Sequence, residues 1–157
     1  MSQTAKRLKE MGVVLPTPAA PAANYAPFVR TGSLLFVSGQ LPFGPDGKLS
    51  ERHQGKLAPN SEIEAAREAA RLCVINVLAQ AHAALGDLDC VKQVVRLGGF
   101  FNVESSFDAL PQAMNGASNL IAELFGDRGR HARMTSGASH LPLNALAAIE
   151  AVFEIAD

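Results

Sequence analysis

Residues 61–86 have the sequence SEIEAAREAARLCVINVLAQAHAALG, which contains the clearest regular hydrophobic pattern in the chain. Ser61 and Glu64 have the spacing of a capping box, and Gly86 is a typical helix stop. Small and apolar residues recur between them at intervals of three and four, at positions 63, 66, 70, 73, 74, 77, 78, 81 and 85. This pattern predicts a helix over residues 61–85 that buries one face against a sheet.

The segments on either side of this helix predict strands and a second helix. The Gly98-Gly99 pair inside the third strand suggests a bulge or the close approach of another backbone. A short helix and a Pro/Ala-rich arm are expected first, up to about residue 23. The further predicted elements are a hairpin (25–29 and 33–40), a long surface loop (42–60), a strand (91–103), a helix (107–125, with Pro111 in its first turn) and a second hairpin (131–139 and 145–155).

The order of these elements predicts an α+β fold, in which two helices cover one face of a mixed sheet. Phe36, Phe100 and Val152 cannot all point toward the helices, because other apolar residues share their strands. The opposite sheet face is therefore expected to need a partner, and self-association is one way to cover it.

Composition places the chain among ordinary globular proteins. It has 157 residues, 48% of them hydrophobic and 18% charged, with a formal net charge of -1. We expect a single domain over residues 1–157, including the N-terminal helix and arm. Two cysteines do not resemble a disulfide framework, and neither a signal peptide nor a membrane span is recognisable, so a cytoplasmic location is expected. The near-neutral charge argues against nucleic-acid binding.

The candidate binding residue is Arg133, within the run Gly129-Arg130-His131-Ala132-Arg133-Met134-Thr135-Ser136-Gly137. A guanidinium stays charged and offers a rigid fork of donors that matches a carboxylate. At a strand end beside small side chains it is suited to binding an anionic small molecule. The competing interpretation is an ion pair between Arg133 and Glu150 or Glu154 on a neighbouring strand.

Three segments carry a recognisable set of motifs. They are Phe36-Val37-Ser38-Gly39-Gln40-Leu41-Pro42, Gly86-Asp87-Leu88-Asp89, and Ala132-Arg133 followed by Leu141-Pro142 and Ile149-Glu150-Ala151. Together they resemble the RidA/YjgF family of reactive-intermediate deaminases, over about residues 18–155. The longer second helix, with Asn115-Gly116-Ala117-Ser118 and the run 129–133, is most similar to the branch labelled L-PSP-like or putative endoribonuclease.

The resemblance implies a chorismate-mutase-like fold that assembles as a homotrimeric barrel with clefts between subunits. It also implies hydrolysis of small 2-imino or 2-enamino acids to 2-oxo acids and ammonia, without metal or cofactor. Arg133 would bind the substrate carboxylate. Tyr25, Ser38, Gly39 and Asn115 would complete the cleft. Tyr25 could instead be a core tyrosine, and Ser38-Gly39 a tight strand crossing.

One position departs from the family pattern. Six residues after Pro142, where the deaminating members carry a glutamate, this chain has Ala148. A methyl group can neither accept a proton nor hold a water molecule. Glu150 lies about 7 Å away on the same strand face if the pleat is regular, and it could serve instead. The alternative function is therefore a non-catalytic module that binds a small carboxylate.

A third interpretation is an endoribonuclease, in which Arg128, Arg130 and Arg133 bind phosphate and His131 acts as acid or base. The neutral charge and the single tyrosine argue against it. His131 is also expected to share a strand face with Arg133, where it would be near a ligand. The four histidines lack metal-ligand spacing, so no zinc site is predicted.

Overall fold

The computed structural model describes residues 1–156, which form one five-stranded sheet with helices on one side. The strand order is β1-β2-β5-β3-β4, and all neighbours are antiparallel except β3 and β4, which are parallel. The strands are β1 (Phe28–Thr31), β2 (Leu34–Gln40), β3 (Val91–Asn102), β4 (Ala132–Ala138) and β5 (Ala147–Ile155), and the α-helices are α1 (Gln3–Glu10), α2 (Ile63–Leu85) and α3 (Leu110–Phe125).

The predicted C-terminal hairpin is wrong, because β4 and β5 do not pair with each other. Strand β3 lies between them and pairs with both. The reason is that α3 connects β3 to β4 as a crossover, which returns the chain in the same direction and makes the pair parallel. The chain then passes back through a short 3-10 turn at Pro142–Asn144, and β5 fills the position between β2 and β3.

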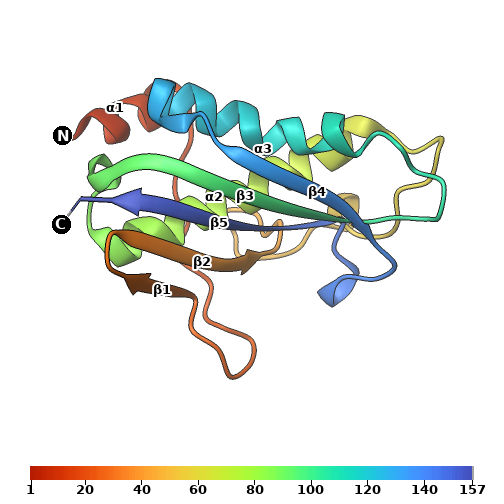
Figure 1. Ribbon diagram of the computed structural model, residues 1–157. Helices are drawn as coiled ribbons and strands as arrows, with labels where there is room; N and C mark the ends of the chain where they lie inside the picture. Colours follow the sequence, from red (N-terminus) through yellow and green to blue (C-terminus); the bar gives the residue numbers. More distant parts are fainter. Residues whose placement is uncertain (157) are drawn as a thin grey trace.

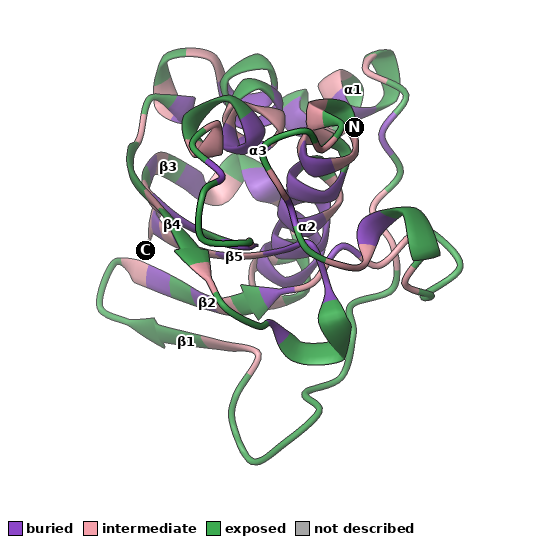
Figure 2. Ribbon diagram, turned by 90° about the vertical axis from the view of Figure 1, so that its right-hand side faces the viewer, coloured by how far each residue is buried: buried purple, intermediate pink, exposed green. Residues whose placement is uncertain are grey.

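Helices α2 and α3 cover one face of the sheet, as Figures 1 and 2 show. Along β5 every second residue is fully buried against them, which is the alternation of a strand covered on one side. The third helix, α1, packs on α3 and on the 3-10 turn before β3 rather than on the sheet. The predicted α+β arrangement with two sheet-covering helices is thus confirmed.

The long helix α2 begins at Ile63 rather than at Ser61, and the predicted capping box does not form. Glu62 is the N-cap residue and makes no side-chain cap hydrogen bond. The Ser61 hydroxyl instead accepts a 2.7 Å hydrogen bond from the Ala58 backbone N–H, so it closes the preceding turn. Gly86 ends the helix as expected, with φ of 75° in the left-handed region.

Two glycine positions set how closely the layers approach each other. The Gly98-Gly99 pair makes room for neighbouring side chains, not for another backbone. A Cβ at Gly99 would overlap the Met114 side chain of α3, and a Cβ at Gly98 would overlap the Glu150 side chain. The register shifts of β3 lie nearer its start. In α3, a Cβ at Gly116 would overlap the Arg67 carbonyl oxygen, so this glycine allows α3 to touch α2.

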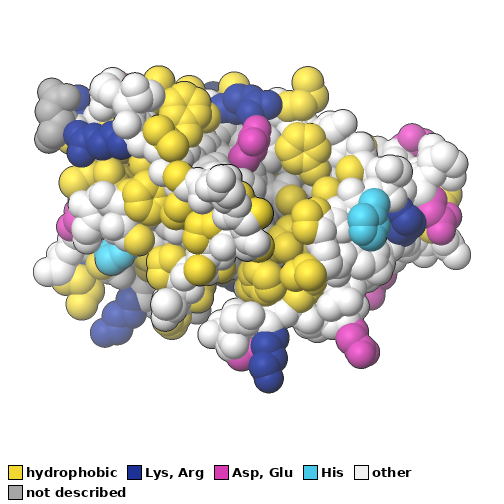
Figure 3. All heavy atoms as spheres, turned by 90° about the horizontal axis from the view of Figure 1, so that it is seen from below, with side chains coloured by type: hydrophobic (Ala, Val, Ile, Leu, Met, Phe, Trp, Pro, Cys, Tyr) yellow, Lys and Arg dark blue, Asp and Glu magenta, His cyan; other side chains and the backbone are white. Residues whose placement is uncertain are grey.

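The sheet face opposite the helices is exposed and largely apolar. Phe36 and Phe100 on this face are 43% and 41% exposed, and Val152 lies opposite Phe36 on the adjacent strand. Figure 3 views the molecule from the side of β1. Hydrophobic side chains gather over the middle of that view, and charged groups lie mainly toward its rim. The expectation that these three residues do not all face the helices is confirmed.

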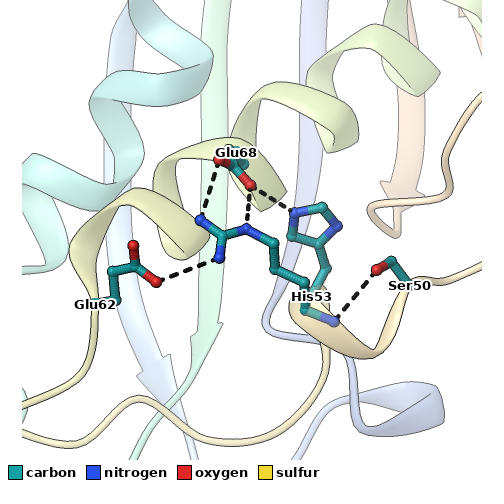
Figure 4. Close-up of polar contacts among 5 residues, drawn as sticks. Ser50, His53, Glu62 and Glu68 are labelled. Atoms are coloured by element: carbon teal, nitrogen blue, oxygen red, sulfur yellow. Dashed lines mark hydrogen bonds and ion pairs between the residues drawn. The ribbon is translucent and has the colours of Figure 1, made fainter.

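The loop over residues 42–60 is attached to α2 by an ionic cluster, drawn in Figure 4. Arg52 donates to the Glu68 carboxylate at 2.7 Å and to Glu62 at 3.3 Å, and buried His53 places Nε2 3.1 Å from Glu68. Hydrogen bonds from Arg52 and His53 lower the pKa of Glu68 to about 2. These contacts anchor the loop before the helix begins.

Candidate functional site

Arg133 lies on β4, at one edge of the sheet, and its side chain reaches α3. In the parallel pair it stands opposite Leu97, which is fully buried on the helix side. The Arg133 Nη1 atom donates to Asn115 Oδ1 at 2.8 Å and to Ser118 Oγ at 3.1 Å, and Nη2 donates to the Pro111 carbonyl oxygen at 3.2 Å. All three acceptors are neutral and belong to α3.

No carboxylate lies within ion-pair distance of Arg133 among residues 1–156. The competing prediction of an ion pair with Glu150 or Glu154 is therefore wrong. The ion pair does not form because both glutamates are on β5, and β3 separates that strand from β4. The three hydrogen bonds use three of the five guanidinium N–H groups. Nε–H and one N–H of Nη2 keep no acceptor within the described residues.

Ser118 links Arg133 to His131. The Ser118 hydroxyl lies 2.9 Å from His131 Nε2, while His131 Nδ1 lies 2.6 Å from the Gly129 carbonyl oxygen. Because a carbonyl oxygen only accepts, Nδ1 must carry the proton, so Nε2 of the neutral ring is the acceptor for the Ser118 hydroxyl. His131 lies just before β4, outside the strand on which it was expected to share a face with Arg133, and the two side chains are linked through the shared serine.

Tyr25 and Gly39 belong to a different part of the molecule. Both line a cavity of ≈ 540 Å³ between the N-terminal arm and the start of the 42–60 loop, together with buried Gln80 and exposed Leu143. Tyr25 is 49% exposed, so the alternative of a core tyrosine is wrong. Ser38 is not among the residues that line this cavity, and its hydroxyl donates a 2.7 Å hydrogen bond to the Ala26 carbonyl oxygen.

The predicted site residues therefore fall into two groups at opposite sides of one sheet. Arg133 and Asn115 lie at the β4 edge, whereas Tyr25 and Gly39 lie beside β1 and β2. Three strand spacings separate β2 from β4, or roughly 14 Å. One small molecule cannot touch both groups within a single chain.

Comparison with known proteins decides the family. The family model described as YjgF/chorismate mutase-like, putative endoribonuclease matches residues 5–155. The chain belongs to this family. Protein TCP17 of Trypanosoma cruzi is 42% identical over 154 residues, covering 98% of this chain and 94% of TCP17.

Two crystal structures of YjgF-like architecture are similar over nearly the whole chain. A protein of unknown function from Agrobacterium tumefaciens is 43% identical with a TM-score of 0.89, and 98% of this chain and 93% of that one are covered. A putative endoribonuclease from Shewanella oneidensis is 38% identical with a TM-score of 0.92, at 98% and 100% coverage. The RidA protein of a Psychrobacter species, at 22% identity and a TM-score of 0.59, shares the fold.

Within the YjgF fold, Ala148 and Glu150 lie on the exposed sheet face, as the regular pleat predicts. Glu150 accepts a 3.0 Å hydrogen bond from Arg96 Nη1 on the neighbouring strand, so its carboxylate already has a cationic partner. Ala148 stands opposite Phe100. Neither position therefore places a carboxylate beside Arg133.

The two arginines just before β4, Arg128 and Arg130, differ in their contacts. Arg128 Nη1 donates to the Val91 carbonyl oxygen at 2.6 Å, and its guanidinium stacks 5.8 Å from the centre of the Phe125 ring. Arg130 is exposed and separate from these contacts. In the described part of the chain there is no cluster of three or more His, Cys, Asp or Glu side chains suited to a metal, and none of its helices is long and apolar enough to cross a membrane.

Sequence reasoning did not assign a role to Ser118. The available signal was its spacing of three residues from Asn115 on a predicted helix, which places both polar side chains on one face. What the spacing could not reveal is that this face meets β4 and receives Arg133.

Proposed function

We propose that this YjgF family member hydrolyses small 2-imino and 2-enamino carboxylic acids to 2-oxo acids and ammonia, with Arg133 binding the carboxylate. The observation that carries the proposal is the state of Arg133. It is exposed, oriented by three neutral acceptors, and keeps two donors free of any acidic partner within residues 1–156. A guanidinium held in this way is organised for an anion before one arrives.

The chemistry demands little of such a site. An imine hydrolyses when water attacks its carbon, and the reaction needs the substrate to be held next to a water molecule with its C=N bond polarised. Proximity and a fixed positive charge supply a large part of that effect without metal or cofactor.

We place this site between subunits of a homotrimer. Tyr25 and Gly39 lie too far from Arg133 to share a ligand in one chain, so the β4 edge of one copy would meet the β1–β2 side of the next. The exposed aromatic residues Phe36 and Phe100 support association through the uncovered sheet face.

A second candidate is a module that binds a small carboxylate without converting it. Ala148 favours it, because the family glutamate is missing and Glu150 is paired with Arg96. An endoribonuclease is the third candidate, and Arg128 argues against it, because its guanidinium is directed to a backbone carbonyl rather than to a phosphate site.

The experiment is to generate 2-aminoacrylate or iminopropionate in the presence of the protein and follow ammonia and pyruvate. Deamination predicts acceleration that falls about 10- to 100-fold in Arg133→Ala, the value of a charged hydrogen bond. The matched control Arg130→Ala removes an exposed cation three residues away and should retain activity within about twofold.

The outcomes separate the three candidates. Pyruvate binding by calorimetry without any acceleration would favour the binding module over deamination. Cleavage of RNA by nuclease-free protein, lost in Arg133→Ala, would favour the endoribonuclease. A rate equal to that in buffer, with no binding, contradicts the role of Arg133 altogether.

A further inference from the structure

The hydroxyl of Ser118 lies between the guanidinium of Arg133 and the imidazole of His131, at 3.1 Å and 2.9 Å. We propose that Ser118 and His131 are the proton-transfer pair of the Arg133 site and supply the base that Ala148 cannot. This inference rests on the proposed deamination. It assigns Ser118 as the catalytic residue next to the substrate and His131 as the residue that takes its proton.

The direction of each hydrogen bond follows from the groups involved. Gly129 offers only a carbonyl oxygen to His131 Nδ1, 2.6 Å away, so the ring proton is on Nδ1. Arg133 can only donate to Ser118 Oγ. The Ser118 proton is therefore directed at the Nε2 lone pair of His131. This is the arrangement of an activated hydroxyl, with a base on one side and a third group that orients the base.

Arg133 contributes a second effect. Its Nη1–H points at Ser118 Oγ, where it stabilises the negative charge that develops as the hydroxyl proton moves to His131. The serine oxygen then keeps one lone pair for an approaching water molecule. A carboxylate bound to the free Nε–H and Nη2–H of the same guanidinium would hold the imine carbon near that water.

No carboxylate lies within ion-pair distance of Arg133 among residues 1–156 to act as a competing base. Glu150 is bound to Arg96 on the exposed sheet face, whereas Arg133 reaches the helix side. Asn115 and the Pro111 carbonyl group, the other partners of Arg133, do not take up a proton at neutral pH. Ser118 and His131 are both partly exposed, so water reaches them.

The proposed sequence balances in protons and bonds. A water oxygen bonds to the imine carbon, one water proton passes to Ser118 Oγ, and the Ser118 proton passes to His131 Nε2. His131 returns that proton by the same path to the substrate nitrogen, which gives the carbinolamine. A second cycle takes the carbinolamine hydroxyl proton, delivers it to the amine and breaks the C–N bond, so that ammonia and the 2-oxo acid leave.

A purely structural interpretation is that Ser118 ties β4 to α3. Chemical rescue separates the two roles, because added imidazole can replace a missing base but not a missing packing contact. The test compares kcat and KM for the full chain, Ser118→Ala, His131→Ala and His131→Gln. Asn119→Ala, one exposed residue further along α3, is the matched control.

We expect kcat to fall about 10²- to 10⁴-fold in Ser118→Ala and His131→Ala. KM should stay within about threefold in His131→Ala, and should rise about 2- to 12-fold in Ser118→Ala because Arg133 loses one of its three acceptors. Imidazole should restore His131→Ala at least about tenfold and leave Ser118→Ala unchanged. His131→Gln keeps a hydrogen-bonding side chain but no base, so it should be as slow as His131→Ala even when its thermal unfolding matches that of the parent chain.

The results that overturn the inference differ from those that overturn the proposed function. If the parent chain deaminates, Arg133→Ala does not, and the Ser118 and His131 variants stay within about threefold, only the proton-transfer pair is wrong. The same conclusion follows if imidazole rescues nothing. If the parent chain produces no ammonia above the rate in buffer, the proposed deamination is wrong, and the proposed proton-transfer role of Ser118 and His131 is wrong as well.

Discussion

Asn115 Oδ1, in the second turn of α3, accepts a 2.8 Å hydrogen bond from Arg133 Nη1 on β4. The two residues are 18 positions apart in the chain and belong to different layers of the fold. Their contact orients the guanidinium while leaving two of its donors free. Asn115 was expected to be a binding residue. The geometry gives it a more specific task, which is to hold Arg133 in place.

Replacing Asn115 should therefore weaken carboxylate binding without abolishing it. In Asn115→Ala the Arg133 side chain loses one of its three fixed acceptors and must be ordered by the ligand, at a cost of about 0.5–1.5 kcal/mol. We expect the Kd for pyruvate, measured by calorimetry, to rise about 2- to 12-fold. Asn119→Ala is the control. An unchanged Kd in Asn115→Ala would contradict the positioning role.

Gly116 should be intolerant of any side chain. A Cβ there would overlap the Arg67 carbonyl oxygen of α2, and backbone cannot move aside as a flexible side chain does. Gly116→Ala is expected to lower the free energy of unfolding by about 1–3 kcal/mol in urea titrations, because α3 must shift off α2. Asn119→Ala on the exposed face should stay within about 0.5 kcal/mol. Equal stability of both variants would refute the close crossing.

Glu68 should contribute a pH-dependent share of stability. Hydrogen bonds from Arg52 and then His53 lower its pKa from an ordinary 4.5 to about 2 in the folded chain. A lowered carboxyl pKa stabilises the fold above the unfolded-state value, and the contribution is lost as pH falls from about 4.5 toward 2.

Because Glu68 is 45% exposed, we expect this contribution to be only about 0.5–1 kcal/mol. Glu68→Gln should thus be less stable than the parent near neutral pH, and the difference in unfolding free energy should narrow below pH 4.5. Glu123→Gln, on the exposed face of α3, serves as the control. A difference that is independent of pH would argue against the ionic cluster.

Asp89 should hold α1 in place. Its carboxylate accepts hydrogen bonds from the backbone N–H groups of Gln3 and Thr4, at 2.8 Å and 2.9 Å, at the N-terminus of that helix. Burial alone would raise the pKa of this carboxyl, but the Thr4 and Gln3 donors and the nearby Arg128 charge outweigh it, and the pKa is lowered.

In Asp89→Asn the helix loses the charge that complements its N-terminus, at a cost of about 0.5–2 kcal/mol. We expect faster amide hydrogen exchange confined to residues 3–10, while exchange in α2 stays slow. Asp108→Asn, an exposed aspartate before α3, should leave both unchanged. Uniform acceleration across the chain would mean that α1 is not a separately held element.

Local pattern was enough to predict most elements of the fold. The helical spacing over residues 61–85, the Gly86 stop and the Pro111 start all hold, since each depends on contacts within one turn of helix. The predicted strands of the sheet also hold to within a few residues. The capping box failed because the Ser61 hydroxyl accepts its hydrogen bond from the Ala58 backbone N–H in the preceding turn.

What the amino-acid sequence determined by itself was the set of elements, the family motifs and the presence of Arg133 at a strand end. Only the tertiary structure decided that β3 separates β4 from β5, that Arg133 therefore meets α3 instead of a glutamate, and that Ser118 stands between it and His131. The physical reason is the different range of the interactions that decide each feature. Periodicity and capping act between residues a few positions apart, whereas strand order and the contacts of an edge strand depend on how distant segments compete for the same places in the sheet.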